Sequence, residues 1–223
     1  MKELIIKVFY NGLGDHLLHS HLPRLAKQKW GYDKVFISNL SNYSNPSIKR
    51  VVWEMNPFVD GFSDGDHDYP TFGSVPPGAN ILDAVSMFYE LDDGERFREP
   101  EVYYKPKMVQ GVQEFVVFEP NHNNAYGIPT RELTEAYFAR EGIVITHQMK
   151  PLHGRSSPGS RPELTAHSLE DFCDVIHSCK AFYCYTSGAA TLAAALGKPV
   201  TVLFVEGINP MFHHSKLHSY VRL

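Results

Sequence analysis

Two glycine-containing turns place polar side chains at the start of helical segments, where the chain is suited to binding an anion. The first is Gly12-Leu13-Gly14-Asp15, between a strand-like segment and an apolar helical segment. Glycine allows a sharp turn and a close approach to a ligand, and the first turn of a helix offers unpaired N–H groups. Asp15 lies at or near the N-cap, where it either caps the helix or presents a carboxylate at the ligand-binding edge of an α/β sheet.

Taken alone, this first turn favours the capping role for Asp15. A turn with two glycines is a weak signal, and it is not a dinucleotide-binding fingerprint because His16 and Leu17 follow where a third glycine is needed.

The second turn, Thr186-Ser187-Gly188-Ala189-Ala190-Thr191, opens a helix made mostly of small residues. The backbone N–H groups of Ser187, Gly188 and Ala189 are expected to point at an anion such as a phosphate. The alternative is a tightly packed strand-to-helix junction with no ligand. We favour ligand binding, because the small residues extend past the cap and two hydroxyl groups face the opening. Replacing Gly188 with valine is then expected to abolish nucleotide binding and to leave the fold largely intact.

The histidines do not indicate a metal site. His214 and His218 are four residues apart, a spacing that suits a metal on a helix, but no carboxylate or cysteine accompanies them. His19 and His21 face different sides of a helix and are expected to be packing or surface residues. The sequence therefore predicts no metal.

The composition limits the class of protein and its partners. Hydrophobic residues make up 43% of the 223 residues, so the chain can bury a substantial core. The formal net charge of -4 gives no reason to expect a nucleic-acid partner. The three cysteines, Cys173, Cys179 and Cys184, do not form a disulfide framework and are expected to be buried free thiols of a reducing compartment. No apolar run reaches the roughly 20 residues of a membrane span, and no signal peptide is recognised, so we expect a cytoplasmic protein.

Strands and helices are expected to alternate along the chain, which implies parallel βαβ units. Strand-like segments occur at 4–10, 35–38, 115–118, 143–145, 182–185 and 200–205, and helical segments at 15–30, 48–55, 80–91, 130–140, 168–179 and 189–196. In the helix at 130–140, Leu133, Ala136 and Tyr137 are expected to face inward. Residues 60–79 are expected to form a long loop and 92–106 a linker between domains. The predicted fold class is α/β, with two Rossmann-like halves facing across a cleft at 1–105 and 106–223.

The order and spacing of these motifs resemble the GT-B fold and, within it, the heptosyltransferase-like glycosyltransferase family 9. The first strand, Gly12-Leu13-Gly14-Asp15 and the apolar helix match the opening of that family, and Asn56-Pro57-Phe58-Val59-Asp60 matches its Asn-Pro-x-Val-Asp element. In the second half, the turn at 186–191, the alanine-rich helix and Gly197-Lys198-Pro199 match its C-terminal pattern. The chain is shorter than a typical member and lacks the long C-terminal helix that returns to the first domain.

The resemblance implies a metal-independent glycosyltransferase without a bound cofactor. It would move a hexosyl or heptosyl group from a nucleotide-sugar to a hydroxyl of a glycan, a lipid-linked or another acceptor. Asp15 would be the general base on the acceptor side, beside Gly12, Leu13 and Gly14. The donor would be bound by Thr186, Ser187, Gly188, Ala189 and Thr191, with Asn121 and His122 lining the cleft. Independently of the resemblance, His213 and His214 near the C-terminus are further candidates for contacting its phosphates.

Three departures from the family pattern leave other functions open. Thr186 stands where the family has Asp, Thr191 stands where it has His, and the segment 119–125 lacks the expected basic residue. The alternatives are a non-catalytic nucleotide- or sugar-binding protein of the same fold, and a nucleotide-sugar epimerase or hydrolase.

Overall fold

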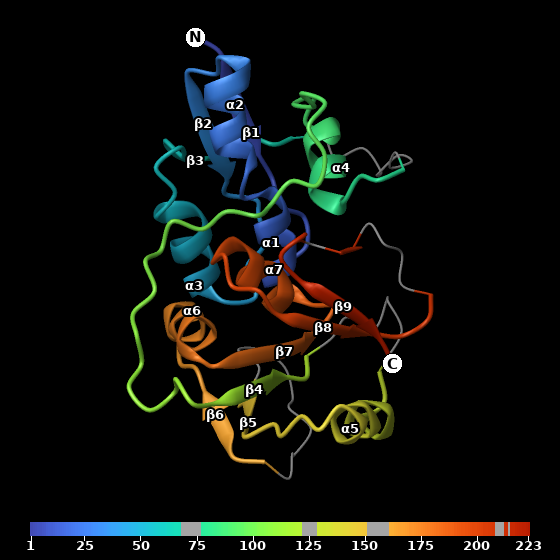
Figure 1. Ribbon diagram of the computed structural model, residues 1–223. Coiled ribbons are helices and arrows are strands. Elements are labelled where there is room, and N and C mark those ends of the chain that lie inside the picture. Colours follow the sequence, from blue (N-terminus) through green and yellow to red (C-terminus); the bar gives the residue numbers. More distant parts are fainter. Residues whose placement is uncertain (68–76, 122–128, 151–160, 208–211, 214) are drawn as a thin grey trace.

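A computed structural model of the chain describes residues 1–67, 77–121, 129–150, 161–207, 212–213 and 215–223. These residues form two parallel sheets, of strand order β1-β2-β3 and β6-β5-β4-β7-β8-β9 (Figure 1). The strands are β1 (Glu3–Ile6), β2 (Lys34–Ser38), β3 (Gly61–Ser63), β4 (Val116–Glu119), β5 (His147–Lys150), β6 (Glu163–Thr165), β7 (Ala181–Tyr185), β8 (Thr201–Phe204) and β9 (Ser219–Arg222). The helices are α1 (Leu13–His19), α2 (Leu22–Trp30), α3 (Pro46–Ile48), the π-helix η1 (Lys49–Glu54), α4 (Ile81–Phe88), α5 (Arg131–Arg140), α6 (Leu169–Ser178) and α7 (Gly188–Ala195).

The predicted fold class is confirmed: helices separate most consecutive strands, and every strand pair in both sheets is parallel. Numbered within its own half, the second sheet has the order 3-2-1-4-5-6, which is the strand order of a dinucleotide-binding Rossmann sheet. The order reverses between β4 and β7, at the centre of the sheet.

The first half differs from the sequence-based expectation in two places. β1 ends at Ile6, because the amide of Lys7 donates to the Tyr89 hydroxyl and that of Val8 donates to the Ser41 hydroxyl, each at 3.1 Å. The predicted helix over 15–30 is two helices, since Pro23 in the first turn of α2 cannot donate a helical hydrogen bond.

Three further expectations are also corrected. The apolar run at 143–145 is an irregular segment after α5, in which Val144 is exposed and Ile145 packs against Phe138 of the helix, and the strand β5 begins only at His147. Leu133 and Ala136 of α5 are exposed, contrary to the prediction, whereas Tyr137 is buried as predicted and Phe138 is buried as well. The short strands β3, β6 and β9 were not predicted, because three or four residues carry too little alternation to separate a strand from a loop.

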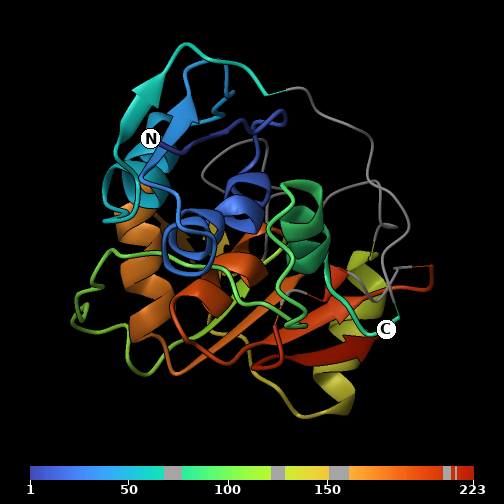
Figure 2. The same cartoon turned by 90° about the horizontal axis from the view of Figure 1, so that it is seen from above.

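The two halves pack directly against each other around one hydrophobic core, which contains residues of both sheets. Helix α1 lies against α7, and α3 lies against α6 (Figures 1 and 2). The α3–α6 contact includes a hydrogen bond from the Leu169 amide to the Ser47 hydroxyl at 3.2 Å, and an ion pair at 3.0 Å joins Arg50 of the adjacent η1 to Glu170 of α6.

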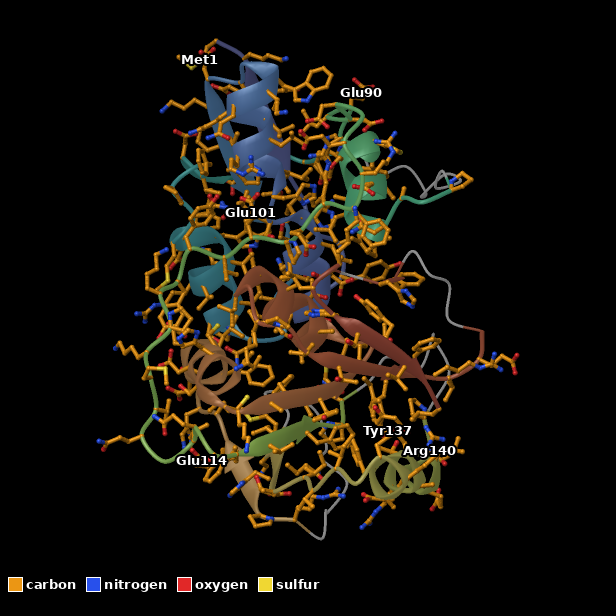
Figure 3. The ribbon with its side chains drawn as sticks, in the orientation of Figure 1. Met1, Glu90, Glu101, Glu114, Tyr137 and Arg140 are labelled. Carbon is orange, nitrogen blue, oxygen red and sulfur yellow. The ribbon has the colours of Figure 1, made fainter. Side chains whose placement is uncertain are left out.

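A connector, residues 89–115, joins the halves without helix or sheet and runs down one side of the molecule, as the labels at Glu101 and Glu114 show in Figure 3. Asp174 of α6 anchors it by accepting hydrogen bonds from the Tyr104 hydroxyl and the Lys107 amide, both at 2.9 Å. The boundary predicted between residues 105 and 106 falls inside this connector and stays a prediction.

The three cysteines are buried and free, as predicted. Burial raises the pKa of each thiol, and that of Cys179 to about 11, so the thiols remain protonated and unreactive near neutral pH. Within the described ranges, no helix has the length and apolar character needed to cross a membrane.

Candidate functional site

The reversal of strand order between β4 and β7 marks the place where an open α/β sheet binds ligands, outside the carboxyl ends of its strands. Glu119 is the last residue of β4, and Ser187 follows β7 at the start of α7. The Ser187 hydroxyl and the Glu119 carboxyl are 3.4 Å apart. The two residues therefore lie on opposite sides of the switch point, at the edge where a ligand would bind.

The start of α7 is a capped helix N-terminus. Ser187 is the N-cap, and its hydroxyl accepts a hydrogen bond from the Ala189 amide at 3.2 Å. The first turn carries no acidic residue, so the positive end of the helix dipole is not offset by the helix itself. The Thr186 hydroxyl is buried and has no hydrogen-bond partner among the described residues. A buried hydroxyl without a partner is costly, which fits a group that awaits a ligand or water.

Thr191 is placed differently from the other predicted donor-site residues. Its side chain is fully buried one turn into α7, and its hydroxyl lies 3.4 Å from the Ser187 carbonyl, to which it donates. The hydroxyl of Thr191 thus serves its own helix and is not offered at the opening.

The start of α1 differs in detail from the sequence-based expectation. The N-cap is Gly12, without a side-chain cap, and Asp15 is the third residue of the helix. The carboxyl of Asp15 folds back over Gly12, where a methyl group added to the glycine would lie 2.7 Å from Asp15 Oδ2. Burial raises the pKa of Asp15, and a hydrogen bond to the Gly12 backbone opposes that rise. Asp15 is a half-buried carboxyl held by the turn that precedes it.

The two glycine turns meet. A Cβ atom added to Gly188 would lie 2.8 Å from the Gly14 nitrogen, and one added to Gly14 would lie 3.3 Å from Gly188 Cα. The expectation that a bulky residue at Gly188 would leave the fold largely intact is therefore wrong, because the backbones of α1 and α7 touch at this position (Figure 1). The contact brings Asp15 of the first half next to the N-terminus of α7 in the second.

Two buried histidines of α1 form hydrogen bonds that fix this helix in place. His16 accepts a hydrogen bond from Trp53 Nε1 at 2.9 Å on Nδ1 and donates from Nε2 to the Asn42 carbonyl at 2.7 Å. His19 Nδ1 lies 2.7 Å from the Asp15 carbonyl. Burial lowers the pKa of both rings to about 4, so both are neutral at pH 7 and have structural roles. His21 is likewise buried, which confirms a packing role for it and for His19.

Sequence reasoning missed Glu119. Only 2% of this residue is exposed, and burial raises the pKa of its carboxyl to about 8. Its Oε1 accepts the Asn121 amide at 3.0 Å, and its Oε2 accepts the Ser187 hydroxyl. The signal in the sequence was a carboxylate directly after an apolar strand, in the segment where the family resemblance calls for a basic residue.

The remaining predicted residues contribute less to this arrangement. Asn121 is exposed and follows β4, as expected, whereas His122 and His214 lie outside the described residues. His213 stacks on Tyr220 at 3.9 Å between ring centroids. His218 Nε2 lies 2.9 Å from the Ala190 carbonyl and holds the C-terminal segment against α7.

A polar cavity of about 270 Å³ lies elsewhere, and none of the predicted site residues lines it. Its walls come from the start of α2 and the connector: His21, Arg24, Glu95, Arg96, Phe97, Arg98, Glu99 and Glu101. Its arginines are largely paired, Arg24 with Glu101 and Arg98 with Asp93. In the part of the chain that the structure describes, no three His, Cys, Asp or Glu side chains are grouped to hold a metal ion.

No protein-family model matches this sequence, and no curated protein matches it either. The solved structures do give matches. A glycosyltransferase of family 9 from Veillonella parvula aligns with 100% of this chain and 85% of its own, at a TM-score of 0.65 and 11% identity. The chain has the fold of the family 9 glycosyltransferases.

Two further structures support the same fold. The ADP-heptose lipopolysaccharide heptosyltransferase II of E. coli matches at a TM-score of 0.57 and 14% identity, over 100% of this chain and 91% of the enzyme. The iron-containing dodecameric glycosyltransferase TibC of enterotoxigenic E. coli matches at 0.62 and 13%, over 91% of this chain. This chain spans 57% of the TibC length. The predicted resemblance is thereby confirmed at the level of fold.

Proposed function

We propose that this protein is a glycosyltransferase that moves a sugar from a nucleotide-sugar donor to an acceptor hydroxyl. The observation that carries the proposal is the Gly14–Gly188 contact, because it places the start of α1, which carries Asp15, against the N-terminus of α7 at the switch point of the second sheet. One half then supplies a base and the other supplies a diphosphate site, which are the two requirements of the transfer.

In this proposal the donor diphosphate binds at the start of α7. The backbone N–H groups of Ser187 and Gly188 and the hydroxyl of Thr186 would interact with its oxygens, and the Ala189 N–H, which donates to the Ser187 hydroxyl, would be shared with them. As the sugar leaves, negative charge grows on the diphosphate, and donors fixed before the reaction stabilise that charge most effectively. Two similar structures contain such ligands: TibC with ADP-D-beta-D-heptose and the E. coli heptosyltransferase WaaC with ADP.

Asp15 would take the proton of the acceptor hydroxyl as the oxygen attacks the sugar. A general base works best when its pKa approaches the working pH, and burial moves the pKa of Asp15 in that direction. The hydrogen bond to the Gly12 backbone fixes the carboxyl beside the turn. We propose that neither a metal nor a bound cofactor takes part, and that the acceptor is a glycan, a lipid-linked or another hydroxyl compound.

The test is direct. Calorimetry with ADP, GDP and UDP identifies the nucleotide, and turnover is then followed as nucleotide release from the matching nucleotide-sugar in the presence of candidate acceptors. Binding should weaken in a Ser187→Ala variant, which removes the hydroxyl that caps α7, and should be retained in a matched Ser44→Ala variant, which removes an exposed serine hydroxyl and keeps the backbone amide. The absence of binding by all three nucleotides would overturn the proposal.

A second candidate function is nucleotide binding without transfer. It is favoured by one observation, the buried Glu119 in the segment where the family resemblance calls for a basic residue. Nucleotide binding together with no transfer, in the presence and absence of Mg²⁺, would select this alternative.

A further inference from the structure

Glu119 is an unusual residue for a diphosphate site, because of its position and because of its hydrogen bond to Ser187. It is a carboxyl group at the carboxyl end of β4, where the ligand of a Rossmann sheet binds. It is also linked to the N-cap of α7, since the Ser187 hydroxyl donates to it at 3.4 Å. An ionised carboxylate here would offset the positive end of α7 and repel a phosphate through a protein interior that screens charge weakly.

The surroundings of Glu119 favour its neutral form. No cation is paired with this carboxyl among the described residues, and it accepts hydrogen bonds from the Asn121 amide and the Ser187 hydroxyl. Two neutral hydrogen bonds do not compensate the burial of a charge. Its pKa is accordingly raised to about 8, with desolvation as the largest cause.

We propose that Glu119 makes binding of the donor diphosphate conditional on a proton: the neutral acid leaves the start of α7 free for the phosphate, and the carboxylate excludes it. This inference rests on the proposed donor site. Glu119 is a positioning residue that acts through Ser187 and through its own charge. Because coupling between two ligands is reciprocal, the bound diphosphate also raises the affinity of Glu119 for its proton.

The neighbouring titratable groups do not produce the same pH dependence. Cys184 faces Glu119 in the sheet, and Tyr185 follows it on β7; burial raises the pKa of both, so both stay neutral to high pH. Asp15 is a second carboxyl near this site, on α1. An Asp15→Asn variant separates its contribution to the pH dependence from that of Glu119.

The experiment measures ADP affinity by calorimetry between pH 7.5 and pH 9.5. The phosphate groups of ADP titrate near pH 6 and keep a constant charge over this range. Because only the protonated form binds, affinity is full below the pKa of Glu119 and falls as pH rises through it, by up to about 25-fold over the two units. The fall should be absent in Glu119→Gln and present in Asp15→Asn.

A second measurement needs no variant. ADP binding at pH 8, titrated in two buffers of different ionisation enthalpy, should show uptake of about half a proton by the wild-type protein, rising toward one at pH 9.5. The measured proton uptake tests the inference even if the Glu119→Gln variant does not fold.

The inference is overturned by wild-type affinity that is constant within twofold over the range, by an equal fall in Glu119→Gln, or by binding without proton uptake. Those outcomes would not contradict the proposed donor site. No binding of ADP, GDP or UDP at pH 7.5 would overturn both the donor site and this inference.

Discussion

Replacing Asp15 with asparagine separates a catalytic role from a structural one. The amide has the shape of the carboxyl and can still accept a hydrogen bond from the Gly12 backbone, but it cannot take a proton. If Asp15 is the general base, transfer should fall by roughly 10²–10⁴-fold, the usual worth of such a group. That loss is about 3–5 kcal/mol of transition-state stabilisation.

The effect of the same substitution on stability should be small. A carboxylate in the first turn of a helix contributes about 0.3–1 kcal/mol through the helix dipole, and burial, the largest influence on the pKa of Asp15, offsets part of that gain. For a chain of this length, the melting temperature should change by no more than about 2–4 °C. A large loss of turnover with a small loss of stability is the combination that identifies a base.

The assay is nucleotide release from the nucleotide-sugar, with the melting temperature measured on the same samples. The pH profile adds an independent test. The base must be ionised, so wild-type kcat/KM should fall as pH decreases through the raised pKa of Asp15, and the residual activity of Asp15→Asn should lack that limb. Asp92→Asn is the matched control, since Asp92 lies in the connector and pairs with Arg96 at 2.8 Å. Activity of Asp15→Asn within threefold of wild type would refute the role.

Three other perturbations test the structural reasoning. Gly188→Ala should lower the free energy of unfolding by about 1–3 kcal/mol in denaturant titrations, because its Cβ would lie 2.8 Å from the Gly14 nitrogen; unchanged stability would contradict the contact. Acidification from pH 6.5 to 4 should lower the melting temperature, since His16 has a folded pKa of about 4 and the unfolded chain binds the proton first; a His16→Gln variant should show a smaller fall, and an equal one would count against this origin. Asp174→Ala should speed trypsin cleavage within the connector, because it removes the acceptor for Tyr104 and the Lys107 amide; an unchanged cleavage rate would show that other contacts hold the connector.

The sequence by itself determined the fold class and the location of both glycine turns. These depend on local physics: apolar segments of strand length alternate with amphipathic helices, and Ser187 caps the helix that follows it. The break before α2 was also readable in principle from Pro23, because proline restricts helices wherever it occurs. The short strands were not readable, since their hydrogen bonds come from neighbours distant in the chain.

Only the tertiary structure decided how the site is assembled. Gly14 and Gly188 are 174 positions apart (188 − 14), and nothing in either turn specifies that their backbones touch. The state of Glu119 likewise depends on burial, and burial is set by everything that packs around the end of β4. Sequence patterns identify residues that are able to do chemistry, whereas the distances and desolvation that give those residues a role arise from long-range packing.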